Sequence, residues 1–283
     1  MSILTTSAKI SVKTAATALA LAFLASTSLG GETVVDLPNG IKGTLAVPDA
    51  GATGPAVVML HGFGSSRDEV GGLFAQQAST LAAEGIASLR IDFRGNGESA
   101  GDLADITFEG LVADAAAARA YLGDVDGVDA ARIGVVGYSF GAAIAMLEPD
   151  AFKSVVVWGQ MGDLQAEFHE FLGQEFYDKA AAEGVASVDL GWRVVTLKQT
   201  FFESLGRHDL AAGFAGYTGP FLTIAGDADP AATYFDQYLG LAGGKTEALT
   251  IPGADHMLGV FSEQPEIGQQ VIDKTTAWLR ETL

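Results

Sequence analysis

Cysteine is absent from this 283-residue chain, and basic residues are scarce. Without cysteine the chain can form no disulfide, no zinc–thiolate site and no lipid-modified cysteine anchor. Sixteen Lys and Arg residues stand against 35 Asp and Glu residues, which gives a formal net charge of −19. A field of that sign repels phosphate backbones and anionic lipid headgroups. Nucleic acid is therefore not an expected partner, and strongly anionic substrates should approach slowly.

Charged residues make up only 18% of the chain and apolar residues 48%, which is enough for one sizeable core. Short and nearly continuous apolar segments alternate with helical patterns, as parallel strands covered on both faces do. The fold class predicted is α/β, with a mostly parallel eight-stranded sheet and helices on both faces. The eight expected strands are residues 33–37, 42–47, 56–60, 87–92, 132–137, 154–158, 220–225 and 246–251.

The most apolar run of the chain lies near its start. Lys9 and Lys13 precede an uncharged stretch at 15–25, and small residues then lead to Gly30. Because this apolar core is too short to span a bilayer, we interpret residues 1–30 as a secretory signal peptide rather than a retained anchor or a plain helix. The predicted location is secreted or periplasmic, with no stable membrane insertion after removal of the signal. Residues 31–283 are expected to form the folded domain.

The segment from Gly137 to Gly141 reads Gly-Tyr-Ser-Phe-Gly, between an apolar run at 132–136 and a small-residue run at 142–147. That order predicts a strand, a tight turn and a helix. Two flanking glycines permit a sharp turn, which would hold the hydroxyl of Ser139 above a helix N-terminus. This is the arrangement of a nucleophile elbow. A serine in this position also needs a base and an acid.

His256 follows the strand expected at 246–251, and loops at the carboxyl end of a sheet are where α/β proteins place catalytic groups. We take His256 as the base. The acid that orients it is expected directly after the strand at 220–225, where Asp227 and Asp229 both stand. We favour Asp229, because it has the G-x-x-D spacing from Gly226 and precedes the turn-forming Pro230, whereas Asp227 could instead cap that turn. Asp255 is a weaker third candidate, because a sequence neighbour rarely turns back onto the adjacent ring.

Acyl transfer requires donors for the developing oxyanion. An apolar strand at 57–60 runs into the loop His61-Gly62-Phe63-Gly64, and the backbone N–H groups of Phe63 and Phe140 are the expected donors. His61 is interpreted as a histidine that fixes this loop rather than as a second base. The two remaining histidines, His169 and His208, are expected to have surface or structural roles.

Taken together, these motifs resemble the serine α/β-hydrolase superfamily, and more narrowly the small esterases related to feruloyl and cinnamoyl esterases and serine-aminopeptidase-like hydrolases. The resemblance implies cleavage of a small-molecule carboxylic ester of small to medium acyl or aryl-acyl size, with no cofactor and no metal. A peptidase or amidase with the same three residues, and a non-catalytic binding protein, stay open as alternatives, as does the oligomeric state. The motifs are His61-Gly62-Phe63-Gly64, Asp92-Phe93-Arg94-Gly95-Asn96-Gly97-Glu98-Ser99, Gly137-Tyr138-Ser139-Phe140-Gly141, Gly226-Asp227-Ala228-Asp229 and Gly253-Ala254-Asp255-His256.

Residues 159–219 break the alternation of strands and helices. They contain two or three helical patterns, aromatic residues at helical spacing and no clear sheet strand. We expect a helical cap insertion over the carboxyl ends of the strands. Trp158, Met257 and Leu258 border the catalytic loops and are candidates for the substrate pocket.

Three local patterns complete the sequence interpretation. Ser66 and Glu69 have the spacing of a capping box and predict a helix that begins there. The glycines at 95–100 fit a loose dinucleotide fingerprint, but Glu98 would repel a pyrophosphate, so a structural turn is expected. Residues 124–129 lack the ligand series of a calcium loop and are expected to be solvated.

Overall fold

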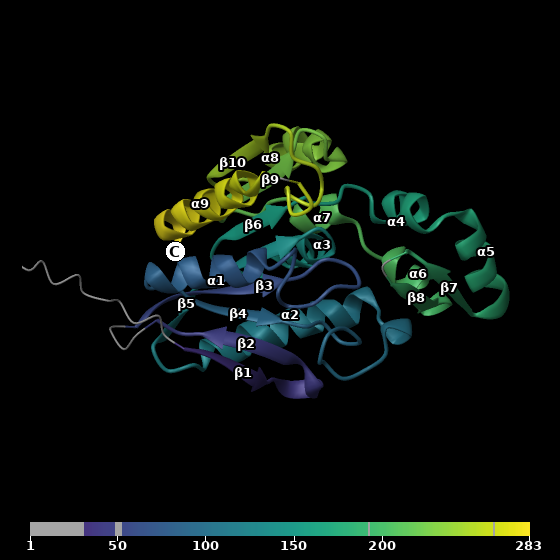
Figure 1. The fold of residues 1–283 in the computed structure, drawn as a ribbon, viewed down its shortest axis with the longest axis horizontal. Coiled ribbons are helices and arrows are strands. Elements are labelled where there is room, and N and C mark those ends of the chain that lie inside the picture. Colours follow the sequence, from purple (N-terminus) through teal and green to yellow (C-terminus); the bar gives the residue numbers. More distant parts are fainter. Residues whose placement is uncertain (1–30, 49–52, 192, 263) are drawn as a thin grey trace, which may run out of the picture.

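The computed structural model describes residues 31–48, 53–191, 193–262 and 264–283. The expected signal peptide at 1–30 lies outside the described residues. Within the described part, eight strands form one sheet in the order β1-β2-β4-β3-β5-β6-β9-β10 (Figure 1). The strands of this sheet are β1 (Glu32–Asp36), β2 (Lys42–Ala46), β3 (Gly54–Leu60), β4 (Ala87–Ile91), β5 (Val128–Tyr138), β6 (Val155–Trp158), β9 (Phe221–Gly226) and β10 (Thr246–Ile251).

The pairings β1–β2 and β2–β4 are antiparallel, and the other neighbouring pairs of this sheet are parallel. The parallel register places Leu60 opposite Gly137, and Trp158 lies opposite both Tyr138 and Ile224. Strands β3, β5, β6 and β9 therefore end at the same edge of the sheet. The loops that carry the predicted site residues all leave from that edge.

Helices cover both faces of the sheet, because the strands present apolar side chains on both sides. Helices α1 and α9 lie together on one face, and α2 and α3 lie on the other (Figure 1). None of the helices in the described residues is long and apolar enough to span a bilayer. The helices outside residues 159–219 are α1 (Leu73–Ala83), α2 (Phe108–Gly123), α3 (Phe140–Leu147), α8 (Phe235–Leu241) and α9 (Pro265–Thr282), with 3₁₀ turns at Pro38–Gly40, Leu103–Asp105, Pro149–Ala151 and Pro230–Tyr234.

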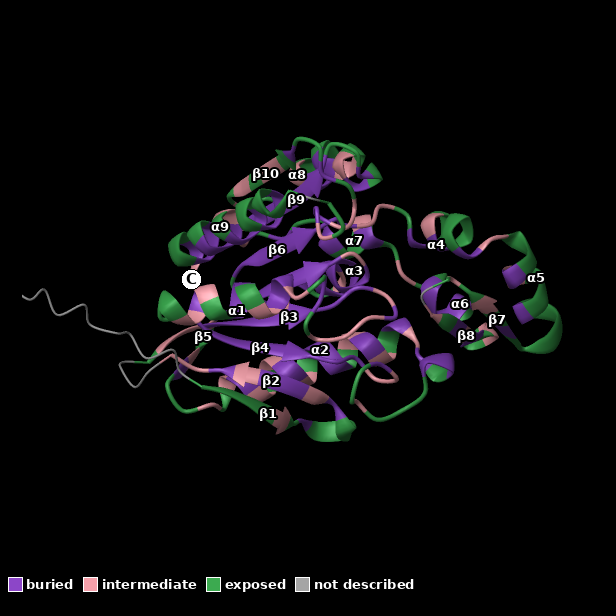
Figure 2. Cartoon of the chain, in the orientation of Figure 1, coloured by how far each residue is buried: buried purple, intermediate pink, exposed green. Residues whose placement is uncertain are grey.

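The predicted fold class is confirmed, and the central strands are almost completely buried (Figure 2). One expected helix start is wrong. Helix α1 begins at Leu73 after Gly72, which has a φ of 87°, whereas Ser66 and Glu69 lie in the turns that precede it. Glu69 makes no capping box because its carboxylate is turned toward the loop after β3, where it accepts a hydrogen bond from the amide of Gly62.

In the residues of the insertion that the structure describes (159–191 and 193–219), there are four helices and also a two-stranded antiparallel hairpin that the sequence interpretation lacked. Most of it projects beyond the carboxyl ends of the sheet strands (Figure 1), while α7 returns to pack on α3. The strands of the hairpin are short and their residues alternate between buried and more exposed positions. Its elements are α4 (Leu164–Leu172), α5 (Gln174–Glu183), β7 (Val185–Asp189), β8 (Val194–Lys198), α6 (Gln199–Leu205) and α7 (Leu210–Phe214).

Candidate active site

Ser139 occupies the turn between β5 and α3 and has a backbone conformation that side chains rarely adopt. Its φ is 52° and its ψ is −111°. The amide of Ser139 donates to the carbonyl of Trp158 at 2.8 Å, and its carbonyl accepts from Ala142 and Ala143. A Cβ on Gly137 or Gly141 would overlap backbone atoms that pack against the turn. The two glycines therefore let a strained serine stand at the end of the sheet.

A chain of hydrogen bonds joins the three residues expected to carry the chemistry. Nε2 of His256 lies 3.0 Å from Oγ of Ser139. Nδ1 of the same ring lies 2.9 Å from Oδ2 of Asp229. Asp229 is buried, and its other carboxylate oxygen accepts from the amide of Ala231 at 3.0 Å. The structure thus brings a hydroxyl, an imidazole and a carboxylate together in the order that proton transfer requires.

The other two aspartates considered from the sequence serve the loops around His256. Oδ1 of Asp227 accepts from the amide of Gly253 at 2.8 Å and ties the loop after β10 to the loop after β9. Oδ1 of Asp255 accepts from the amide of Met257 at 3.1 Å. Asp229 is therefore the carboxylate that reaches the imidazole, in agreement with the preference drawn from the sequence.

Burial and charge act in opposite directions on His256. Burial alone would lower the pKa of His256, but the hydrogen bond from its ring to Asp229 and the negative charge of that carboxylate outweigh it and raise the pKa above the ordinary 6.5. A carboxylate can only accept, so Nδ1 of His256 carries the proton that it shares with Asp229. In the neutral ring, Nε2 is then free to accept the hydroxyl proton of Ser139.

Tyr138 contacts His256 through both its hydroxyl and its ring. Its hydroxyl donates to the backbone carbonyl of His256 at 2.9 Å, and the two rings lie 5.3 Å apart at an interplanar angle of 31°. On another side, Gly159 leaves room that a side chain would take: a Cβ there would lie 3.0 Å from ring atoms of His256 and 3.1 Å from Oδ2 of Asp229. Tyr138 thus holds the segment that carries the imidazole, and the missing side chain at Gly159 lets the ring lie next to Asp229.

The two expected oxyanion donors, Phe63 and Phe140, both line the cavity at Ser139. Phe140 is the first residue of α3, so its amide has no acceptor within the helix. Phe63 follows β3 in the loop that starts at His61. Their rings also contact each other edge to face, with centroids 5.5 Å apart. Their role as donors to an oxyanion stays a prediction.

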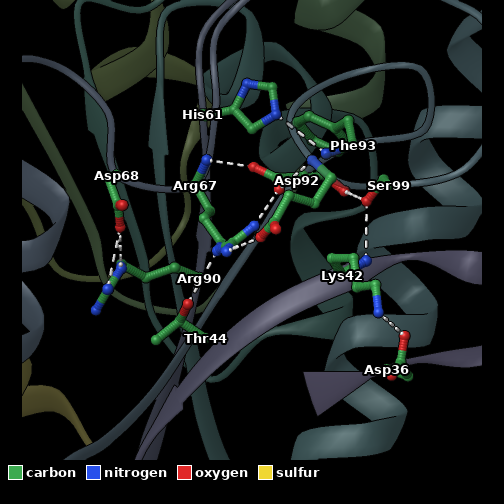
Figure 3. A network of polar contacts seen from close by, with 11 residues as sticks. Asp36, Lys42, Thr44, His61, Arg67, Asp68, Arg90, Asp92, Phe93 and Ser99 are labelled. Carbon is green, nitrogen blue, oxygen red and sulfur yellow. Dashed lines mark hydrogen bonds and ion pairs between the residues drawn. The ribbon is translucent and has the colours of Figure 1, made fainter. Parts of the chain in front are cut away.

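His61 fixes this loop, as interpreted from the sequence. Its side chain is fully buried, and Nε2 accepts the backbone N–H of Phe93 at 3.0 Å. Because Nε2 is the acceptor, Nδ1 must carry the proton that binds the carbonyl of Gly62 at 2.7 Å. Burial lowers the pKa of His61 to about 4, so the ring stays neutral near neutral pH. Figure 3 shows this ring between the two loops that it joins.

A second anchor holds the far end of the same loop. Buried Asp92 accepts from the amide of Arg67 at 2.7 Å and pairs with the Arg67 guanidinium, which also donates to Thr44 (Figure 3). The same guanidinium pairs with Glu98. Asp92 is wrapped by the glycine turn at 95–100, where Gly97 has a φ of 52° and a Cβ would overlap the Asp92 carboxylate. This turn is structural, as expected, and brackets the loop from 61 to 67.

A cavity of about 700 Å³ opens beside Ser139. Met257 lines it, as expected, but Trp158 and Leu258 are wrong assignments. Trp158 is fully buried on the face of the sheet that α1 and α9 cover, where it packs against Phe74 and donates to Thr275. Leu258 has a φ of 53°, and its side chain packs into the core with α1 and α9. The lining also includes six Phe and Tyr residues, which are Phe63, Tyr138, Phe140, Phe168, Phe171 and Phe261.

The charged groups of the cavity wall are mostly acidic. Glu69, Glu167 and Asp229 line it, and His256 is the basic group among the lining residues. Glu167 accepts from the amides of Gly162 and Asp163 at the start of α4, and burial raises its pKa. The sequence interpretation had not placed either glutamate in the site. The position of Glu167 four residues after the N-cap Asp163 could have predicted its contact with the start of α4, but not its place in the cavity wall.

The remaining observations concern groups of possible metal ligands and the two histidines His169 and His208. Across residues 31–48, 53–191, 193–262 and 264–283, no three or more His, Asp or Glu side chains group as a metal site would require. His169 is at the surface of the cap and contacts Gln174, and His208 lies 3.4 Å from Glu109. Both have the surface or structural positions expected of them.

A serine at a strand–helix elbow on this sheet order defines the class of α/β hydrolases. The chain belongs to the alpha/beta hydrolase family, whose model matches residues 57–267. It is accordingly a hydrolase by class, and the resemblance drawn from its motifs is confirmed.

Related proteins agree with this assignment. An uncharacterized protein of Mycobacterium tuberculosis is 28% identical over 260 residues, which cover 89% of this chain and 80% of the relative. Among solved structures, DcsB in complex with its substrate analogue superposes with a TM-score of 0.73 at 17% identity, covering 89% of this chain and 99% of that one. Est1E from Butyrivibrio proteoclasticus with bound ferulic acid gives a TM-score of 0.69 at 22% identity, covering 87% and 99%. At these identities the structures show the common fold alone.

Proposed function

We propose that this protein is a serine esterase that cleaves carboxylic esters of small to medium acyl or aryl-acyl groups. The observation that carries the proposal is the hydrogen-bonded chain from Ser139 through His256 to Asp229 at the wall of a cavity. The strained backbone of Ser139 adds to it, because such strain concentrates at functional sites.

The reaction proceeds in two acyl-transfer steps. Nε2 of His256 takes the hydroxyl proton as Oγ of Ser139 attacks the ester carbonyl, and the amides of Phe63 and Phe140 bind the oxyanion. The imidazolium then protonates the leaving alcohol, and the serine ester remains. Water enters, gives its proton to His256 and attacks the acyl carbon, after which Oγ leaves with that proton as the acid is released.

The cavity wall supports a neutral and partly aromatic substrate. Phe63 and Phe168 contact each other edge to face at 5.3 Å, a geometry that also suits an inserted aryl group. Three carboxylates in the wall would repel an acid group on the substrate. Est1E, which shares the fold, was solved with ferulic acid bound. By analogy, we propose that the cavity of this protein accepts an aryl-acyl group.

The first test combines a fluorophosphonate probe with a graded series of p-nitrophenyl esters, from acetate to dodecanoate. We expect wild-type labelling and turnover, and loss of both in Ser139→Ala, with turnover lower by about 10³-fold or more. Ser187→Ala is the matched control, because that serine lies on β7 and its hydroxyl contacts Thr196. Full turnover in Ser139→Ala would refute the assignment.

The same assay separates the alternatives. A faster rate on amides than on matched esters would favour a peptidase or amidase, in which every residue of the chain from Ser139 to Asp229 keeps its role. A folded wild-type protein that neither labels nor turns over any ester or amide would favour a binding protein.

A further inference from the structure

Glu69 is a buried carboxyl group that the proposed reaction leaves without a role. Its side chain is 7% exposed and forms part of the cavity wall near Ser139. Burial raises the pKa of Glu69 to about 7, against the opposing effect of its hydrogen bonds. Keeping a carboxyl group in such a place is unfavourable unless it is well hydrogen-bonded. The partners of Glu69 therefore indicate what it does.

Both partners of Glu69 lie on the loop that follows β3. Oε2 accepts the backbone N–H of Gly62 at 3.2 Å, and the carboxylate is also hydrogen-bonded to the side chain of Ser65. Phe63, one of the two expected oxyanion donors, lies between these attachments. Glu69 thus holds the loop from the side that faces the cavity.

The peptide unit between Gly62 and Phe63 links these contacts to the oxyanion. Its carbonyl accepts from Nδ1 of His61 at 2.7 Å. The described residues contain no cis peptide bond, so the N–H of Phe63 points opposite to that carbonyl. The direction of the Phe63 amide therefore depends on two buried side chains, since His61 holds the carbonyl and Glu69 holds the preceding amide.

We propose that Glu69 is a positioning residue of the acyl-transfer site: by fastening the Gly62 amide it directs the Phe63 N–H at the carbonyl oxygen of the substrate. This inference rests on the proposed serine-esterase function and adds a residue to it. Glu69 does not contact the reacting atoms. It acts through the loop, and its effect should be confined to the transition state, where the oxyanion develops.

Three variants test this role. Glu69→Ala removes the acceptor, whereas Glu69→Gln keeps an oxygen of similar position that can still accept the Gly62 N–H. Asp68→Ala is the matched control, because Asp68 is the adjacent carboxylate, is largely exposed and pairs with Arg90 away from the cavity. Fluorophosphonate labelling of the wild type comes first and establishes the serine chemistry separately.

We expect Glu69→Ala to lower kcat by about tenfold to a hundredfold with KM within about threefold, because misplacing an oxyanion donor weakens only the transition state. Glu69→Gln should restore kcat to within about threefold of wild type, and Asp68→Ala should match wild type. Affinity for a trifluoromethyl ketone, which forms an oxyanion adduct with serine, should fall in Glu69→Ala in proportion to kcat/KM. Affinity for the carboxylic acid product should not change.

Several results would overturn the proposal. A kcat of Glu69→Ala within threefold of wild type would show that the loop after β3 keeps its position without Glu69. A loss confined to KM would make Glu69 a substrate contact, and a Gln variant as poor as the Ala variant would show that charge rather than hydrogen bonding matters. A wild-type protein without labelling or turnover would remove the proposed esterase function, and this proposal with it.

Discussion

Replacement of Glu69 by glutamine should change how the stability of the protein depends on pH. Burial raises the pKa of Glu69 from the ordinary 4.5 to about 7. The folded state therefore binds this proton more tightly than the unfolded chain does. The resulting stabilisation is fully present below about pH 4.5 and is lost as pH rises through about 7. Glutamine cannot ionise, so Glu69→Gln lacks this loss.

The size of the effect follows from the two pKa values. A rise from 4.5 to about 7 corresponds to about 3 kcal/mol, because each pH unit is worth about 1.4 kcal/mol. At pH 5 the folded carboxyl is mostly neutral, and the amide has nearly the same shape and hydrogen bonds. At pH 8 the wild type must hold a buried carboxylate beside Tyr138, and the glutamine variant does not. From pH 5 to pH 8, the free energy of unfolding of the variant should therefore rise by about 2 to 3 kcal/mol relative to that of the wild type.

Urea denaturation of both proteins at pH 5 and pH 8, followed by circular dichroism, measures this difference. For each protein the free energy of unfolding at pH 5 is subtracted from that at pH 8. Subtracting the wild-type result from the variant result then removes the contribution of the many surface carboxylates. Asp68→Asn serves as the exposed control and should show a change below about 0.5 kcal/mol. The reasoning would be refuted if the free energies of unfolding of Glu69→Gln and wild type differed by the same amount at both pH values, within about 0.5 kcal/mol.

Other predictions follow from the site. Asp229→Asn should lower kcat by about 10²–10⁴-fold, because the ring of His256 loses its charged partner. In the same steady-state assays, kcat of Asp227→Asn should stay within about threefold of wild type. Equal losses of kcat in the two variants would contradict the assignment of Asp229. The rise of kcat/KM with pH should have its midpoint above 6.5, because Asp229 raises the pKa of His256, which must be neutral to act as a base; a midpoint below 6.5 would contradict it. Phe171→Ala and Phe261→Ala should raise KM about threefold to tenfold for long or aryl esters but not for acetates, because both exposed rings line the cavity.

The sheet and the reacting groups could be predicted because their signals are local. Strand β9 was expected at 220–225 and is observed at Phe221–Gly226, since an apolar run between turns has few other interpretations. The elbow at Ser139 was identifiable because the flanking glycines are required by backbone contacts rather than by side-chain packing. The start of β5 was missed by four residues, because Asp129 to Ala131, near its beginning, are more exposed than the residues from Ile133 onward.

The pocket was harder to predict, because it depends on which way a side chain points. Trp158 adjoins Gly159, which lies beside His256, yet alternation along β6 turns the ring of Trp158 toward α1. Leu258 follows Met257, but its positive φ turns its side chain back into the core. Phe261 lies in a loop without periodicity, 81% exposed, and no sequence pattern marks it as part of the wall.

The buried polar side chains near the cavity have a common consequence for movement. His61, Glu69 and Asp92 each hold the loop after β3 from a different side, and Arg193 of the cap donates to the carbonyl of Gly64. Because each contact satisfies a buried polar group, breaking them together would be unfavourable, and we expect the loop to move little relative to the sheet. If access to the cavity requires movement, we predict it in the elements that carry the exposed rings Phe171 and Phe261, which are α4 and the loop after β10.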